Sequence, residues 1–250
     1  MFRFLPVLLL EIQIHSITAS LIVEVLQPRY RAELGDDVIM GCRFRASEPL
    51  NLTRLSVLWQ ARLSREDAAK EVYKLTKGQE DLTQQHRDFR GRATVLQAEL
   101  KMGCSMLRLT NVKLRDAGTY ICLVDYKGDD YKYINLEVEA RYKKINIQET
   151  REEEDMILTC QSEGYPQADI SWYSENDANF STFASTTYEM TDDGRYNITS
   201  VLRVKPSIYE NYTCIFWNKE LNEKTSAHRA VFLSGKRRRK AQLPKRHSDL

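Results

Sequence analysis

The chain has 250 residues, of which 42% are hydrophobic and 29% charged, with ten Gly and six Pro. This length allows one large domain or two modest ones, and the composition is that of a globular protein, which excludes the collagen-like and intrinsically disordered classes. The net charge is +2, but the segment 234–250 holds seven Lys and Arg against one Asp, so the rest of the chain is mildly acidic.

Residues 1–20 predict a secretory signal peptide. Arg3 precedes an apolar run that fades through Glu11 and Gln13, and we expect cleavage near Ser20. The uninterrupted apolar stretch falls well short of the ~20 residues of a membrane span, so an N-terminal anchor is the weaker interpretation. No later segment qualifies as a span, and we expect the mature chain to be secreted and extracellular.

Five cysteines form two similar patterns with one residue left over. The patterns are Cys42, Trp59 and Cys122, then Cys160, Trp172 and Cys214, with a Tyr two residues before each second cysteine. In an immunoglobulin sandwich two cysteines bridge the sheets, a Trp packs on the bridge and such a Tyr anchors a corner. We therefore predict an all-β fold of two tandem immunoglobulin-like sandwiches, with bridges Cys42–Cys122 and Cys160–Cys214, and Cys104 unpaired.

The spacing of the cysteines distinguishes the two domains. The separation from Cys42 to Cys122 leaves room for the two extra strands of a variable-type domain, whereas the shorter one from Cys160 to Cys214 fits a constant-type domain. We predict a variable-type domain over 21–139, a constant-type domain over 140–233 and a basic disordered tail over 234–250, since runs of like charge repel one another. The tail could instead hold heparan-type polyanions; a nuclear role conflicts with the signal peptide, and no nucleic-acid partner is expected.

Four tripeptides match the acceptor pattern for N-linked glycosylation. They begin at Asn51, Asn179, Asn197 and Asn211. One such tripeptide is weak support, but four in a chain with a signal peptide and paired cysteines indicate an extracellular glycoprotein.

Nothing in the chain has the spacing of a catalytic or metal site. His86, His228 and His247 are scattered, and no phosphate-binding loop, nucleophile elbow or zinc-protease motif occurs. The pairs Asp129–Asp130 and Asp192–Asp193 adjoin glycines in expected turns. We predict that the protein is not an enzyme and holds no cofactor or metal.

Asp116 also has a structural interpretation. It belongs to the run Asp-Ala-Gly-Thr-Tyr-Ile-Cys that ends at Cys122. In variable-type domains this acid commonly pairs with an Arg that begins a neighbouring strand, and Arg92 or Arg90 is placed for it.

Alternation along the strands predicts an exposed face on the first domain. Because Trp59 and Cys122 point inward, their neighbours at odd offsets point outward, and the same argument applies to the strand holding Ile134 and Leu136, with Tyr131 expected at the hairpin tip. The face would contain Ser56, Leu58, Gln60, Ile121, Leu123, Tyr131, Tyr133 and Asn135, edged by Asp125, Asp129, Asp130 and Lys132. Such a patch usually marks a partner site.

Several segments carry a resemblance to a known family. They are 122–134, the junction 140–146 and 160–172, together with the more specific Gly78-Gln-Glu-Asp-Leu82, Asp130-Tyr-Lys132 and Tyr142-Lys-Lys-Ile-Asn146. Over about 21–233 the chain resembles the butyrophilin-like family of costimulatory and co-inhibitory ligands of the immunoglobulin superfamily.

The resemblance implies an inhibitory ligand that engages the programmed death receptor on T cells and down-regulates their activation. Carried over by position, the receptor-facing residues are Leu21, Ile22, Ser56, Leu58, Gln60, Ile121, Leu123, Asp125, Asp129, Asp130, Tyr131, Lys132 and Tyr133. The family has a membrane span after the second domain, whereas Gly235 here leads into a basic run. We hypothesise a soluble splice form or a truncated gene model, with membrane contact only if a span is missing from this form.

Other interpretations remain open. The exposed face could pair with a second copy of the chain, pair with another costimulatory ligand in cis, or lie partly under the hairpin around Val72 and Tyr73. A soluble chain could act as a decoy of the receptor, or the basic tail could make it an adhesion or matrix protein. Cys104 could be a buried free thiol or could cross-link two chains.

Overall fold

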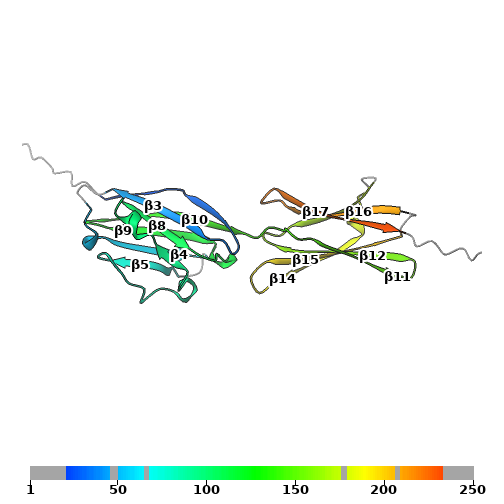
Figure 1. Ribbon diagram of the computed structural model, residues 1–250, viewed down its shortest axis with the longest axis horizontal. Coiled ribbons are helices and arrows are strands. Elements are labelled where there is room, and N and C mark those ends of the chain that lie inside the picture. The colour runs from blue at the N-terminus through cyan, green and yellow to red at the C-terminus, as the bar shows by residue number, and fades with distance from the viewer. Residues whose placement is uncertain (1–20, 46–49, 65–67, 176–178, 206–208, 233–250) are drawn as a thin grey trace, which may run out of the picture. The chain divides into compact units, whose positions relative to one another are not determined.

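The computed structural model describes residues 21–45, 50–64, 68–175, 179–205 and 209–232 (Figure 1). The chain divides into two compact units, one ending at Val138 and the other beginning at Glu139. The expected signal peptide, basic tail and His247 lie outside the described residues. Within them, no helix is long and apolar enough to cross a membrane.

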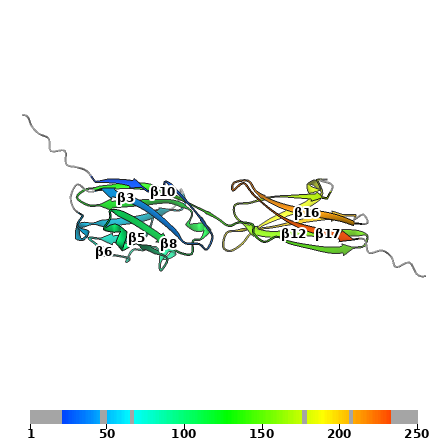
Figure 2. The same cartoon turned by 45° about the horizontal axis from the view of Figure 1, so that its top comes forward.

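The first unit is a sandwich of two sheets (Figures 1 and 2). The four-stranded sheet has the order β1 (Ile22–Val25), β3 (Val38–Arg45), β8 (Cys104–Leu109), β7 (Ala93–Val95). The six-stranded sheet has the order β2 (Arg29–Glu33), β10 (Asp129–Glu139), β9 (Gly118–Asp125), β4 (Ser56–Arg62), β5 (Lys70–Thr76), β6 (Gln79–Glu80). Its short helices are η1 (Leu52–Arg54), η2 (Arg87–Phe89), α1 (Gln97–Leu100) and η3 (Leu114–Asp116). The strands β5 and β6 are the extra strands of a variable-type sandwich.

The second unit is a smaller sandwich with a core of its own. One sheet has the order β11 (Asn146–Glu152), β12 (Asp155–Gly164), β15 (Tyr196–Val204), β14 (Ala184–Met190), and the other has the order β13 (Asp169–Ser174), β16 (Tyr209–Asn218), β17 (Glu223–Phe232). A single short helix, η4 (Ser181–Phe183), is assigned among the described residues of this unit. Seven strands in two sheets are typical of a constant-type domain, so the predicted fold is confirmed.

Side-chain alternation explains why these segments form sheets with a buried inner face. In β4 the residues Val57, Trp59 and Ala61 are at most 1% exposed, while Leu58 and Gln60 between them are half-buried. The same alternation occurs in β9 and β12. Because successive side chains of a strand point to opposite faces, this pattern places one set in the core and the other on the surface.

Both expected bridges are present. Cys42 is joined to Cys122 and Cys160 to Cys214, with Cα–Cα distances of 6.5 and 6.6 Å. Cys104 is a free, half-buried cysteine at the start of β8, opposite Arg43 of β3. In the chain-entropy model, closing loops of this length contributes about 4 kcal/mol per bridge.

Each buried Trp also makes one polar contact in the core. Trp59 Nε1 donates a hydrogen bond of 2.9 Å to Ser105 Oγ, and Trp172 Nε1 donates one of 3.0 Å to Ser200 Oγ. All four side chains are fully buried. A serine on the facing sheet therefore satisfies the indole N–H in both units, which lets a large aromatic ring fill the core without an unpaired donor.

We expect Ser105→Ala to lower the free energy of unfolding of the first unit by about 1–3 kcal/mol, because the buried indole N–H of Trp59 would lose its acceptor. Urea denaturation would measure the change. The exposed Ser185 of β14 provides a control, and Ser185→Ala should change stability by less than about 0.5 kcal/mol. An equally small effect at Ser105 would contradict the assigned hydrogen bond.

Asp116 pairs with Arg92 rather than with Arg90. Arg92 Nη1 and Nη2 lie 2.7 and 3.0 Å from the two carboxylate oxygens of Asp116, which is fully buried. Arg90 instead donates to the backbone oxygen of Gln85. The hydroxyl of Tyr120 donates to the backbone oxygen of Asp116 at 2.8 Å, so the bidentate pair and the tyrosine contact hold the same corner of the sandwich.

Candidate functional site

The exposed face of the six-stranded sheet is built from β10, β9, β4 and β5. Hydrogen-bonding register aligns Tyr131, Leu123, Leu58 and Lys74 in one row across these strands. The next row contains Tyr133, Ile121, Gln60 and Glu71. Neighbouring strands lie about 4.8 Å apart, so the apolar members of the two rows are in mutual contact range. We call Leu58, Ile121, Leu123, Tyr131 and Tyr133 the Tyr131 face.

Two tyrosines project furthest from this face. Tyr131 is 47% and Tyr133 57% exposed, whereas Leu58, Ile121 and Leu123 are half-buried. The two tyrosine rings meet edge to face, with centroids 5.6 Å apart and planes at 86°. This is a favoured aromatic arrangement, and it packs the two rings against each other beside the half-buried Leu58, Ile121 and Leu123.

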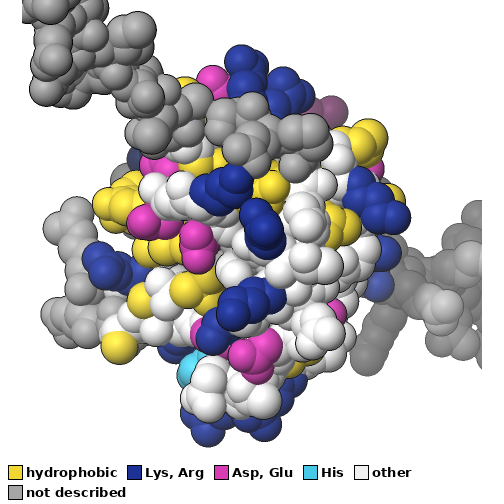
Figure 3. All heavy atoms as spheres, turned by 90° about the vertical axis from the view of Figure 1, so that its left-hand side faces the viewer, with side chains coloured by type: hydrophobic (Ala, Val, Ile, Leu, Met, Phe, Trp, Pro, Cys, Tyr) yellow, Lys and Arg dark blue, Asp and Glu magenta, His cyan; other side chains and the backbone are white. Residues whose placement is uncertain are grey.

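A polar row borders the Tyr131 face. Ser56 pairs with Asp125, which in turn pairs with Asp129, and both aspartates are exposed. Figure 3 looks onto the end of the first unit where β10 begins, and shows hydrophobic side chains grouped with acidic and basic ones. An apolar centre with a charged margin is the usual anatomy of a protein-binding surface.

The turn between β9 and β10 corrects one expectation. Tyr131 was expected at the hairpin tip, but the turn is made by residues 126–128, where Lys127 has φ 56° and Gly128 has φ 135°. Tyr131 lies two residues inside β10, level with Leu123. The residue after the tip, Asp129, pairs with Asp125, so the tyrosine belongs to the body of the sheet, where its backbone is held on one side by β9.

Asp130 and Lys132 alternate with the tyrosines and so point to the other side of β10. The carboxylate of Asp130 accepts hydrogen bonds from Val23 N at 2.8 Å and Tyr131 N at 2.8 Å, and Lys132 Nζ lies 3.1 Å from it. Partial burial works against the charged form, but these donors outweigh it and hold the pKa of Asp130 below its usual range. Asp130 thus links the start of β10 to β1, and it lies on the side of β10 away from the Tyr131 face.

The two N-terminal residues do not join the Tyr131 face. Leu21 is 5% exposed and belongs to the core of the first unit, and Ile22 is 53% exposed on β1, which lies in the other sheet. Of the thirteen receptor-facing residues suggested by position, the structure therefore gathers nine on or beside the face: Ser56, Leu58, Gln60, Ile121, Leu123, Asp125, Asp129, Tyr131 and Tyr133.

Sequence reasoning missed the contribution of β5. Lys74 and Glu71 extend the two rows beyond Leu58 and Gln60, and a hollow of about 500 Å³ beside Gln60 is lined by Glu71 and His86 among others. Burial raises the pKa of the Glu71 carboxyl, and its buried Oε1 has no hydrogen-bond partner among the described residues. The pairing of β4 with β5 shifts register between Trp59 and Gln60. Because of this irregularity, simple alternation of side chains does not predict which residues of β5 face outward.

The hairpin around Val72 and Tyr73 does not cover the Tyr131 face. Both are fully buried in the hydrophobic core, so neither lies over the face. Among the described residues, no group of three or more His, Cys, Asp and Glu side chains could hold a metal ion.

Comparison with known proteins decides the family. Residues 142–226 match the family model "Butyrophilin subfamily 3 member A2-like, Ig-C domain". The chain is 38% identical over 202 residues to Programmed cell death 1 ligand 1 of Mus musculus, covering 79% of this chain and 67% of that protein. The chain belongs to the butyrophilin-like ligand family.

Further relatives agree with this assignment. The V-set domain containing T-cell activation inhibitor 1 of Mus musculus is 30% identical over 216 residues, which cover 84% of this chain and 73% of that protein. The crystal structure of bovine butyrophilin matches the fold with a TM-score of 0.68 at 21% identity, over 85% of this chain and 99% of that chain. Like the two curated ligands, the chain is an extracellular immune ligand of the costimulatory and co-inhibitory class. Those two relatives are binding proteins and not enzymes.

Proposed function

We propose that the protein binds the programmed death receptor on T cells through the Tyr131 face and thereby down-regulates T-cell activation. The observation that carries this proposal is the alignment of Leu58, Leu123 and Tyr131 in one row across β4, β9 and β10. Three strands of a rigid sandwich hold these side chains in place, so little ordering is required when a partner binds.

The similarity to Programmed cell death 1 ligand 1 of Mus musculus supports the choice of receptor. The chemistry of the face supports a protein partner: exposed tyrosines supply large contact area at low entropic cost, and apolar patches with charged margins are rare on surfaces that remain solvated. Asp125 and Asp129 would lie at the rim, where charges mainly affect association rate and specificity.

The test is binding of the purified full chain to the programmed death receptor of the same species, by surface plasmon resonance, with sedimentation measured in parallel. We expect a one-to-one complex and a ligand that is monomeric when free. The immobilised chain should also reduce cytokine release from stimulated T cells that carry the receptor. A chain that forms dimers and does not bind the receptor would instead identify the face as a homodimer interface.

A chain that binds the receptor in solution, yet relieves inhibition by a membrane-bound ligand, would be a decoy. Valency and tethering decide between these outcomes, so the assay compares immobilised with free chain. Absence of binding in both formats would contradict the proposal.

A further inference from the structure

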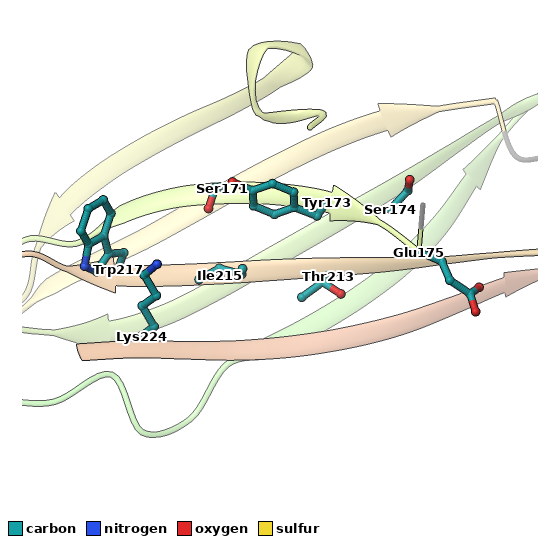
Figure 4. A pocket seen from close by; sticks show the side chains of 8 residues that line it. All are labelled: Ser171, Tyr173, Ser174, Glu175, Thr213, Ile215, Trp217 and Lys224. Carbon is teal, nitrogen blue, oxygen red and sulfur yellow. The ribbon is translucent and has the colours of Figure 1, made fainter. Parts of the chain in front are cut away.

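The second unit has a hollow of about 530 Å³ on the outward face of β13, β16 and β17 (Figure 4). Its lining includes Ser171, Tyr173, Thr213, Ile215, Trp217 and Lys224. Among the lining residues, Ser171, Thr213 and Ile215 have shorter side chains than Tyr173 and Trp217. This difference in length produces the hollow.

Register arranges the outward side chains in rows. The first row is Asp169, Trp217 and Lys224, the second is Ser171, Ile215 and Ser226, and the third is Tyr173, Thr213 and His228. The next row on β16 and β17 is Asn211 and Ala230. Asn211 is therefore on the same outward side, two residues or roughly 7 Å along β16 from Thr213.

The lining combines apolar surfaces with hydroxyl groups. Tyr173 and Ile215 offer carbon surfaces, while Ser171 and Thr213 offer hydroxyls, and the hydroxyl of Thr213 lies 2.8 Å from His228 Nδ1. The lysines Lys219 and Lys224 lie 5.3 and 4.8 Å from the ring of Trp217. A ligand that suits this surface has apolar faces and hydroxylated edges, which is the chemistry of an oligosaccharide.

Asn211 differs from the other three acceptor asparagines in its contacts. The side-chain oxygens of Asn51, Asn179 and Asn197 each accept a hydrogen bond. The side-chain amide of Asn211 makes no hydrogen bond to any part of the chain that the structure describes. Its side-chain nitrogen, the atom that would carry the glycan in the sequence Asn-Tyr-Thr, lies beside the hollow and, like those of the other three acceptors, donates to none of the described residues.

We propose that an N-linked oligosaccharide on Asn211 folds back along β16 and docks in this hollow, over Tyr173, Thr213 and Ile215. Covalent attachment one row away gives the sugar a high effective concentration at the surface, so weak contacts suffice to hold it. The docked sugar covers the outward face of the three-stranded sheet.

The test is the rate at which peptide N-glycosidase releases each glycan from the native full chain expressed in mammalian cells, resolved by site with mass spectrometry. The glycan on Asn197, which lies on β15 in the other sheet of the same unit, is the internal control. We expect release at Asn211 to be about tenfold slower, the factor that about 1.4 kcal/mol of docking free energy produces.

Two variants separate docking from simple crowding around Asn211. Tyr173→Ser removes the aromatic wall and should bring release at Asn211 to the rate at Asn197. Tyr188→Ser removes an exposed tyrosine on β14 and should leave the slow release unchanged. An unglycosylated Asn211, equal rates at Asn211 and Asn197, or slow release that persists in Tyr173→Ser would overturn the proposal.

Tryptophan fluorescence provides a second readout in case Tyr173→Ser impairs folding. Trp59 and Trp172 are fully buried, whereas Trp217 is half-buried, so quenching by acrylamide reports mainly on Trp217. The Asn211→Gln chain should be quenched more strongly than the glycosylated one, and Asn197→Gln should not. Identical quenching in all three proteins would contradict docking.

Discussion

Replacing Arg92 by methionine is expected to lower the free energy of unfolding of the first unit by about 3–5 kcal/mol, because it leaves a buried carboxylate without its counter-charge. Asp116 is fully buried, and the Arg92 side chain is 12% exposed. The hydrogen bond from Lys113 N to Asp116, at 2.8 Å, would remain, but it supplies no full positive charge. Arg92 also donates to Asp88 O and Asn111 O, so its loss affects three segments.

The matched control is Arg108→Met. Arg108 makes a 2.7 Å pair with Asp37 at the surface, where the two side chains are 48% and 43% exposed. An exposed pair of this kind contributes about 0–1 kcal/mol. The two units have separate cores, so unfolding in urea should be followed by hydrogen exchange of peptides from 21–138. Equal losses for the two variants would contradict the account of the buried pair.

This pair also illustrates what sequence can predict. The run from Asp116 to Cys122 indicated a buried acid that needs an Arg partner, but two arginines two residues apart were equally eligible. The choice depends on how η2 and β7 turn the backbone between Arg90 and Arg92. That path is set by tertiary packing of Phe89, which is fully buried, and no local pattern in the sequence reports it.

Alternation of side chains within β4 and β9 predicted the exposed face, but alternation could not predict which residues lie at the edges of that face. Trp59 in β4 and Cys122 in β9 are buried, and they fix which side chains of each strand point inward. The residues beside them on the same strand point outward, as alternation predicts. Leu21 was assigned to the face by position in the family, but backbone pairing places β1 in the opposite sheet. The pattern of buried and exposed residues within one strand does not say which distant strand it pairs with.

Tyr131→Ala is expected to weaken receptor binding by at least about 2 kcal/mol, which is roughly 30-fold in Kd. Tyr131 packs against Tyr133 and stands opposite Leu123, so truncation removes an aromatic anchor and leaves its neighbours more exposed to water. Because the side chain is 47% exposed in the free protein, the variant should fold normally. Thermal unfolding of the two proteins should therefore be nearly the same.

Tyr188 provides a control of the same residue type and similar exposure. It lies on β14 of the second unit and is 44% exposed. Tyr188→Ala should change receptor affinity by less than about 0.5 kcal/mol, since the proposed contact surface is confined to the first unit.

The most direct measurement is thus the affinity of the full chain, Tyr131→Ala and Tyr188→Ala for the programmed death receptor of the same species, at one salt concentration. The account predicts a large loss for Tyr131→Ala with native thermal stability, and none for Tyr188→Ala. Unchanged binding in Tyr131→Ala would contradict the assignment of the Tyr131 face as the receptor-binding surface.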